Sequence, residues 1–279
     1  MTVSEPWPCA GIRRLLLQSW LLLCCTPLAA TELRLCYEAA SQSPNLPLYQ
    51  IGSVQVAGLH AALTVAALQQ QQVQFQLQRM PWLRCLKAVS TGQLDAAIGV
   101  GWTAERAAQI QFPLDAKGQP DEQKALLALN YHIYTKVDSP LRWDGEQLQQ
   151  LRYGIAAPKG FITADKLAAL GALAQTDAEI DAGLLLTLQQ RIDGFVLAEG
   201  AMDQLLQQHK QRHLIKKLQP PFLRQSLYLV FSQRSYDQHS ALIQQLWQQL
   251  PQLKQQWQQQ PPPKINTDSA AMIGNIIPL

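Results

Sequence analysis

The fold class follows from the stretch VQFQLQRMPWLRCLKAVSTGQLDAAIGV at residues 73–100. Apolar and polar residues alternate over 73–80, which predicts a strand. Pro81 stands where a helix can begin, because the first turn needs no proline N–H, and Gly92 is expected to end that helix. The small apolar residues of 94–100 predict a second strand that is buried on both faces. Strand, helix and strand in this order indicate a parallel α/β unit.

The same alternation of strands and helices runs through the rest of the chain. Upstream, we expect a strand at 33–38 and a helix at 54–70, where apolar residues recur at helical spacing. Downstream, further strands are expected at 124–137, 151–157, 192–199, 213–218 and 226–232. Further helices are expected from Thr103, at 163–170, from a capping box at Thr176 to about 190, at 201–210, and last from about 240 with a kink or division at Pro251.

These elements form two βα units, with one strand and one helix left over. The simplest assembly returns the leftover pair to the first unit, so lobe 1 would hold 31–120 and 225–260 and lobe 2 would hold 121–224. Each lobe is expected to be a mixed, mostly parallel sheet flanked by helices. The chain then crosses between the lobes twice, which predicts a hinge and a ligand cleft. The tail at 261–279 shows no periodicity and is expected to be disordered.

The composition is that of an ordinary globular protein and excludes some functions. The chain has 279 residues, of which 47% are hydrophobic and 15% charged, with a formal net charge of +3. There is no basic run with interleaved aromatic residues, so nucleic acid is not an expected partner. The spacing of the histidines suits a metal only at His209 and His213, and that stretch is rich in Gln and Lys. We therefore expect a monomer with no metal and no cofactor.

The N-terminus has the pattern of a targeting segment. Arg13 and Arg14 precede an apolar run at 15–28, and two alanines follow it. A short apolar run between basic and small residues predicts a signal peptide at 1–30, and therefore export to the periplasm. The alternative is an N-terminal membrane anchor.

Removal of this segment would change the cysteine chemistry. Cys9, Cys24 and Cys25 would be lost, and Cys36 and Cys85 would remain. An even pair in an oxidising compartment predicts one disulfide between them, and the alternative is two buried free thiols.

Several short runs carry a resemblance to one family. PWLRCL at 81–86, GQLDAAIG at 92–99 and TAER at 103–106 resemble, in this order, the family 3 extracellular solute-binding proteins. These are the polar amino-acid binders of ABC import systems and their stand-alone relatives. RIDGFV at 191–196 is similar to a strand in the second lobe of the same family. The resemblance covers roughly 32–257 and implies a two-lobe periplasmic-binding-protein-like fold without enzymatic activity.

The resemblance also implies a set of ligand contacts in lobe 1. Arg106 is expected to clamp a ligand carboxylate, because its planar fork suits bidentate binding. The turn that includes Gly99 and Gly101, together with Thr103, is expected to add backbone and hydroxyl contacts. Trp102 either stacks on the ligand or packs beneath the turn.

Further contacts are expected from lobe 2 and from an aromatic wall. Glu199 is the nearest match to the family's acidic residue that meets the ligand ammonium, and the alternative is a helix-start glutamate that complements the helix dipole. Gly160 and Phe161 are expected to offer backbone donors. Tyr49 or Tyr37 is expected to form an aromatic wall.

Together these features predict a periplasmic protein that captures a small polar ligand for transport. The expected ligand is an amino acid or a related carboxylate, and the expected protein partner is an inner-membrane ABC permease. Two alternatives stay open: a stand-alone sensor that signals through a membrane partner, and a periplasmic dehydratase that uses Glu199 or Glu38 for proton transfer.

Overall fold

The computed structural model describes residues 1–2, 32–38, 47–176 and 178–265. The chain divides into two compact units, 1–31 and 32–279, and the fold below is that of the second unit. The predicted signal peptide and residues 266–279 of the predicted tail lie outside the described residues.

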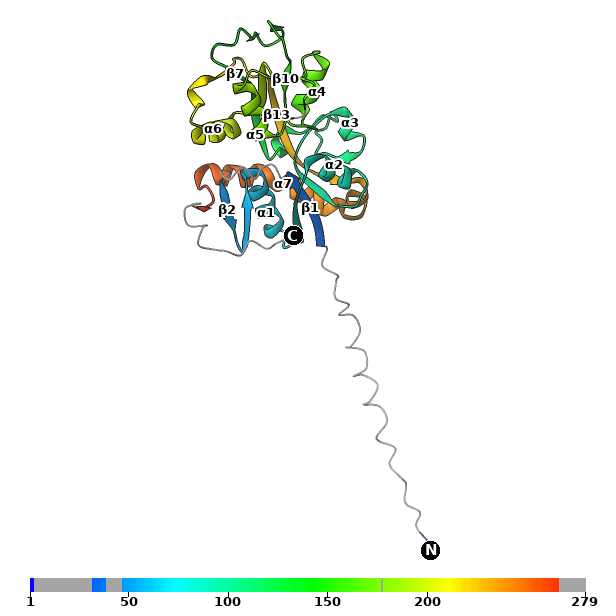
Figure 1. The fold of residues 1–279 in the computed structure, drawn as a ribbon. Coiled ribbons are helices and arrows are strands. Elements are labelled where there is room, and N and C mark those ends of the chain that lie inside the picture. The colour runs from blue at the N-terminus through cyan, green and yellow to red at the C-terminus, as the bar shows by residue number, and fades with distance from the viewer. Residues whose placement is uncertain (3–31, 39–46, 177, 266–279) are drawn as a thin grey trace. The chain divides into compact units, whose positions relative to one another are not determined.

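A mixed nine-stranded sheet forms the framework of this unit (Figure 1). Its main path runs β10-β11-β7-β13-β5-β1-β4, with β6 and β12 attached to β13 and β7. β1 pairs in parallel with β4 and β5, and β10 pairs in parallel with β11, as right-handed α/β units require. The strands span Glu32–Glu38 (β1), Gln74–Met80 (β4), Ala96–Gly101 (β5), Ile110–Gln111 (β6), Leu127–Lys136 (β7), Ile155–Ala156 (β10), Gly194–Ala198 (β11), Ile215–Lys217 (β12) and Leu223–Ser232 (β13).

Helices connect and cover these strands. Among the described residues, none of the helices is long and apolar enough to cross a membrane. They span Leu59–Gln70 (α1), Trp82–Ser90 (α2), Ala104–Ala107 (α3), Ile162–Ala169 (α4), Ile180–Leu188 (α5), Glu199–Gln208 (α6) and Gln233–Gln259 (α7). The capping box expected at Thr176 is wrong, because α5 begins later and its N-cap is Glu179. The backbone of α7 departs from helical angles at His239, whereas Pro251 is accommodated inside the helix.

A small sheet differs from two of the expectations for lobe 1, at 54–57 and at 264–265. Part of the expected helix at 54–70 is strand β3 (Val54–Ala57), which pairs with β2 (Leu48–Ile51). The β-branched valines favour a strand, and Gly58, with φ at 87°, separates it from α1. Lys264–Ile265 form strand β14 on β2, so the expected disorder is wrong for these two residues. A separate hairpin joins β8 (Arg142–Trp143) to β9 (Leu148–Gln149).

Buried side chains form separate cores on the two sides of the β7–β13 pair. Two clusters hold residues of β1, α1, α2, β5 and α7, including Trp247, whose Nε1 donates to Leu229 O at 2.9 Å. Two other clusters hold residues of β10, β11 and α4 to α6, including Phe195 and Phe222. We refer to these two halves as lobe 1 and lobe 2. β7 and β13 belong to both, because they pair in antiparallel fashion through the register Leu223–Leu227 against 127–131.

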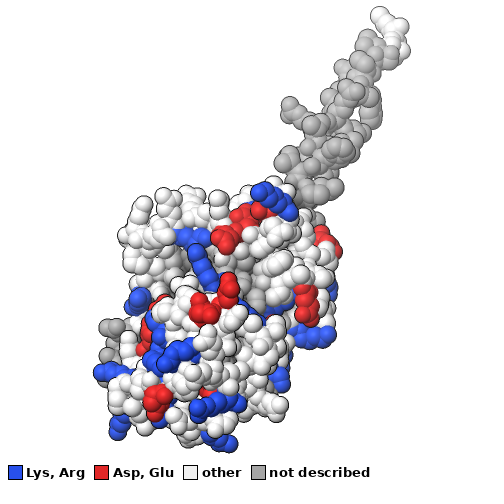
Figure 2. All heavy atoms as spheres, turned by 90° about the horizontal axis from the view of Figure 1, so that it is seen from above, with Lys and Arg blue, Asp and Glu red and all other residues white. Residues whose placement is uncertain are grey.

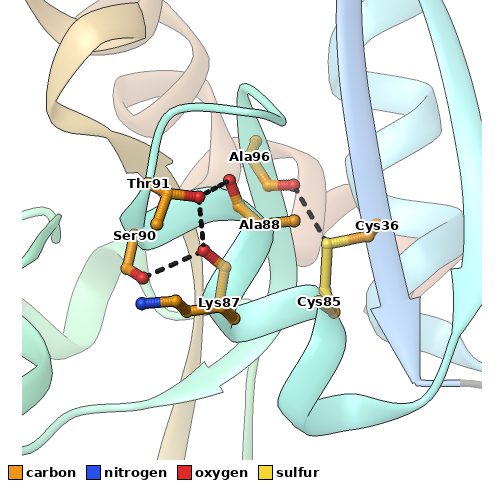
Figure 3. Close-up of a disulfide and its surroundings, with 7 residues drawn as sticks. All are labelled: Cys36, Cys85, Lys87, Ala88, Ser90, Thr91 and Ala96. Atoms are coloured by element: carbon orange, nitrogen blue, oxygen red, sulfur yellow. Dashed lines mark hydrogen bonds between the residues drawn. A yellow bond between two sulfur atoms is a disulfide. The ribbon is translucent and has the colours of Figure 1, made fainter.

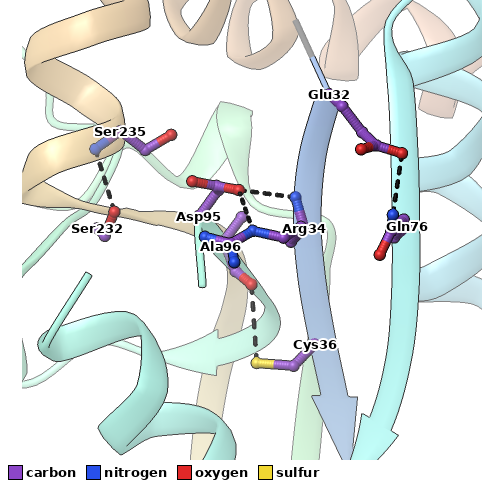
Figure 4. Close-up of polar contacts among 8 residues, drawn as sticks. All are labelled: Glu32, Arg34, Cys36, Gln76, Asp95, Ala96, Ser232 and Ser235. Carbon is purple, nitrogen blue, oxygen red and sulfur yellow. Dashed lines mark hydrogen bonds and ion pairs between the residues drawn. The ribbon is translucent and has the colours of Figure 1, made fainter. Parts of the chain in front are cut away.

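Two aspartates of the sequence motifs hold strands in place. The carboxylate of Asp95 accepts a hydrogen bond from the N–H of Arg34 in β1 at 2.8 Å (Figure 4). In lobe 2, Asp193 Oδ2 accepts from the N–H groups of Arg152, Tyr153 and Gly154 at 2.7, 2.6 and 2.9 Å. Both motifs therefore contribute first to folding, because each carboxylate satisfies backbone donors at the start of a strand.

A disulfide joins Cys36 of β1 to Cys85 of α2, as predicted (Figure 3). Both residues are fully buried. The bond fixes the helix that follows β4 to the central strand of lobe 1.

Replacing both cysteines, Cys36→Ser with Cys85→Ser, should lower the free energy of unfolding by about 2–4 kcal/mol. The disulfide closes a loop with a sequence separation of 49, so its loss enlarges the unfolded ensemble. Urea denaturation followed by circular dichroism measures the change, and wild type under dithiothreitol should behave as the double variant. Equal midpoints for oxidised wild type and the double variant would contradict a structural disulfide.

Candidate functional site

A cavity of about 330 Å³ is lined by both lobes and by the strands that connect them. This volume is in the range of small-molecule sites in proteins. Lobe 1 contributes Glu38, Pro47, Tyr49, Gly58, Leu59, His60, Trp82, Ile98, Gly99, Gly101 and Arg106. The connecting strands contribute Leu127, Leu129, Tyr131 and Leu227, and lobe 2 contributes Phe161, Ile162, Ile180, Leu197, Ala198, Gly200, Ala201 and Gln204.

The connecting strands supply an apolar wall. Leu127, Leu129 and Tyr131 alternate along β7 and therefore share one face of the strand, and Leu227 lies opposite Leu127 in β13. Burial raises the pKa of Tyr131 to about 12, so its hydroxyl stays protonated at neutral pH. Sequence reasoning expected a strand here but missed its role in the cavity, although the alternation in LALNY was a usable signal.

Arg106 joins the two lobes through its guanidinium. Thr103 is the N-cap of α3 and accepts from the Arg106 N–H at 3.1 Å, which orients the start of the helix. Arg106 Nη1 donates to Gly101 O at 3.0 Å, and Nη2 donates to Gly160 O of lobe 2 at 2.8 Å. Two of its five N–H donors are therefore used by backbone carbonyls.

The charge of Arg106 has no carboxylate in direct contact among the residues that the structure describes. Burial lowers the pKa of Arg106, while the more distant carboxylates of Asp165 and Glu105 oppose this shift. A guanidinium still stays protonated, so the cavity wall carries a positive charge. A buried charge is costly unless it is paired, and an anion in the cavity would pair it.

Gly160 is the meeting point of the two lobes. Its carbonyl accepts from Trp82 Nε1 at 3.1 Å as well as from Arg106, and the Phe161 ring lies edge-on to Trp82 with the centroids 6.3 Å apart. Gly160 has φ at +76°, and a Cβ there would lie 2.3 Å from Leu83 Cδ2. The backbone angle therefore favours glycine, and a Cβ here would also require the exposed Leu83 side chain to shift.

His60 occupies a slot between two glycines at the cavity wall. A Cβ on Gly58 would lie 2.8 Å from His60 Cε1, and one on Gly99 would lie 3.1 Å from His60 Cδ2. Burial lowers the pKa of His60 to about 4, so the imidazole is neutral at physiological pH. Sequence reasoning considered this histidine only as a metal ligand and missed its place in the cavity.

Half of the expected ligand contacts line the cavity. These are Arg106, Gly99, Gly101, Phe161 and Tyr49. Gly160 precedes the lining residue Phe161 and presents a carbonyl acceptor to Arg106, and the backbone donor that we expected from it stays a prediction.

The other expected contacts have structural partners instead. Thr103 caps α3, and Trp102 packs against the core around α2 with its indole N–H buried and unpaired among the described residues. Tyr37 is buried in the core of lobe 1, with the Arg79 guanidinium 5.5 Å from its ring. Glu199 begins α6 and accepts a hydrogen bond from Lys217 Nζ. None of these four side chains lines the cavity.

The charged surface adds no second site on the face that Figure 2 shows, where positive and negative side chains are interspersed. Within the described ranges, no group of three or more His, Cys, Asp or Glu residues could hold a metal ion.

The architecture is the two-lobe periplasmic-binding-protein-like fold, and solved structures share it. A histidine kinase sensor domain with similarity to periplasmic binding proteins matches with a TM-score of 0.63 and 19% identity, over 81% of this chain and 92% of that chain. The substrate-binding protein of an amino acid ABC transporter matches at 0.60 and 15%, over 81% and 94%. An ABC uptake substrate-binding protein from Streptococcus pneumoniae with bound histidine matches at 0.60 and 13%, over 81% and 88%.

These identities show the fold and leave the ligand open. No family model matches the chain, and no curated protein matches it.

Gly160→Ala should lower the free energy of unfolding by up to about 1 kcal/mol more than Gly171→Ala does, because the exposed Leu83 side chain must shift to admit a Cβ at position 160. Both glycines flank α4 with positive φ, but a Cβ at 171 meets nothing within 4 Å, whereas one at 160 meets Leu83. The difference therefore isolates the contact between the lobes from backbone strain. Urea denaturation measures both, and equal losses would show that Gly160 does not need its close approach to α2.

His60→Gln should reduce the loss of stability on acidification. The pKa of His60 is about 4 in the folded state against a model value of 6.5, so the unfolded state binds the proton first as pH falls. Stability contributed by the neutral imidazole is complete above about pH 6.5 and is lost toward about pH 4.

Between these limits wild type should lose up to about 2 kcal/mol more than the variant, measured by urea denaturation across the pH range. His213→Gln replaces an exposed histidine and should behave as wild type. Identical pH profiles for wild type and His60→Gln would contradict the burial of a neutral imidazole.

Proposed function

We propose that this chain is a periplasmic solute-binding protein that captures a small carboxylate-bearing ligand, an amino acid or a related acid. The observation that carries the proposal is the charge of Arg106, which contacts no carboxylate of the described residues and lines a cavity shared by both lobes. Within that part of the chain, three N–H donors of the guanidinium remain for an anion, which suits a planar carboxylate.

Ligand capture would act through the contact between the lobes. A ligand that touches Arg106 on one side and lobe 2 residues such as Phe161 and Gln204 on the other is bound more tightly in the closed form. Its differential affinity would then shift the equilibrium toward closure. The proposed lobes are 31–120 with 225–260 and 121–224, and the separate cores on either side of the β7–β13 pair support this division.

Delivery to an inner-membrane ABC permease is the physiological role that we propose. The likeness to the substrate-binding protein of an amino acid ABC transporter supports it, and the Cys36–Cys85 disulfide suits an oxidising compartment such as the periplasm. The likeness to a histidine kinase sensor domain favours a second candidate, a sensor that reports ligand to a membrane partner.

Binding without catalysis fits the surroundings of Glu199 better than a dehydratase that uses Glu199 does. Proton transfer by a glutamate at neutral pH requires a raised pKa. Lys217 instead lowers the pKa of Glu199 through a hydrogen bond and its charge. The similar structures named above are binding or sensor proteins.

Arg106→Ala should weaken ligand binding by more than about 100-fold, because the ligand carboxylate would be left without its charged partner. Isothermal titration calorimetry across amino acids and small carboxylates measures the loss for whichever compounds bind wild type. Arg84→Ala removes an exposed arginine of α2 and serves as the matched control. Undiminished affinity in Arg106→Ala would reject the clamp.

A further inference from the structure

The body of the cavity is suited to an apolar ligand. Leu127, Leu129 and Leu227 come from the connecting strands, and Ile162, Ile180 and Leu197 come from lobe 2. His60 adds a neutral ring that its glycine slot holds in place. Desolvating polar ligand groups against such walls costs free energy unless each finds a hydrogen bond, whereas an apolar body gains from burial.

Glu199, the residue expected to bind a ligand ammonium, is already paired with a lysine of the protein. A zwitterionic ligand needs an anion for its ammonium, and Glu199 is the residue that would provide it from lobe 2. Its carboxylate accepts a hydrogen bond from Lys217 Nζ of β12, and its Oε2 lies 3.9 Å from His132 Nε2 of β7. Its neighbours Ala198 and Gly200 line the cavity in its place.

Among the described residues, the carboxylate that does line the cavity is that of Glu38 at the end of β1. It already has an interaction of its own. If Glu38 held a ligand ammonium, zwitterions would bind better than simple acids. A comparison of acids with matching amino acids distinguishes the two cases.

We propose that the site takes an apolar monocarboxylic acid without an α-ammonium group, with the carboxylate on Arg106 and the hydrocarbon body against the leucine and isoleucine walls. The inference rests on the proposed function and narrows its ligand class. It differs from the zwitterion expected from the sequence, because Glu199 is paired with Lys217 while Arg106 contacts only backbone carbonyls among the described residues.

Matched ligands with the same body and different charges test the proposal by calorimetry on the chain as it exists after export. The aromatic set is 3-phenylpropanoate, L-phenylalanine and phenethylamine, and the aliphatic set is 4-methylpentanoate and L-leucine. In at least one set the acid should bind more than about tenfold tighter than its amino acid, because an unpaired ammonium would lose its hydration in the cavity. Phenethylamine should not bind.

Two variants test how Leu129 and Glu38 contribute to the preference for the acid. Leu129→Asn keeps the side-chain size and should weaken the preferred acid by about tenfold, because it places an amide against the apolar body. Glu38→Gln should not weaken binding of the amino acid, because the inference places no ligand ammonium on that carboxylate. Circular dichroism of both variants checks that they are folded.

The outcomes separate this inference from the proposed function. Tighter binding of the amino acids than of the acids, or a loss of amino acid affinity in Glu38→Gln, overturns the inference and leaves a binding protein for amino acids. The inference is also overturned if neither acid binds and either L-arginine or L-glutamine, which are included in the panel, binds. If no compound binds, or if phenethylamine binds best, both the inference and the carboxylate clamp on Arg106 are overturned.

Discussion

One guanidinium holds the two halves of this binding site together. Arg106 donates to Gly101 O in its own lobe and to Gly160 O in the other, so a single side chain bridges the cavity wall. Its position depends on Thr103, whose hydroxyl caps the short helix from which Arg106 projects. The same contact leaves a positive charge facing an apolar cavity, and that unbalanced charge is the physical basis of the proposed anion capture.

The Cys36–Cys85 disulfide and the Arg106–Gly160 contact are connected through helix α2. Cys85 ties α2 to β1, and Trp82, one turn earlier on α2, donates to the same Gly160 carbonyl that Arg106 uses. The carbonyl therefore receives two donors from elements that are themselves fixed within lobe 1. A Cβ at position 160 would require Leu83 to shift, so glycine allows the lobe 2 loop to approach this pair closely.

The motifs that resemble known solute-binding proteins are chiefly folding motifs. Asp95 and Asp193 each accept backbone N–H groups at the start of a neighbouring strand, one in each lobe. Arg106, in contrast, belongs to the TAER motif and lines the cavity. The pairing of Glu199 with Lys217 lies outside the motifs that carry the resemblance.

The sequence by itself determined the α/β order of elements, the Cys36–Cys85 pair and the place of Arg106, because periodicity, residue count and a short motif are local properties. The pattern at 54–57 predicted the start of a helix, whereas these residues form a strand. A strand of four residues leaves little periodic signal. Only the tertiary structure decided that Glu199 pairs with Lys217 and that His60 sits between Gly58 and Gly99. These contacts join residues from different elements, and side-chain pairing across elements depends on packing that no local pattern encodes.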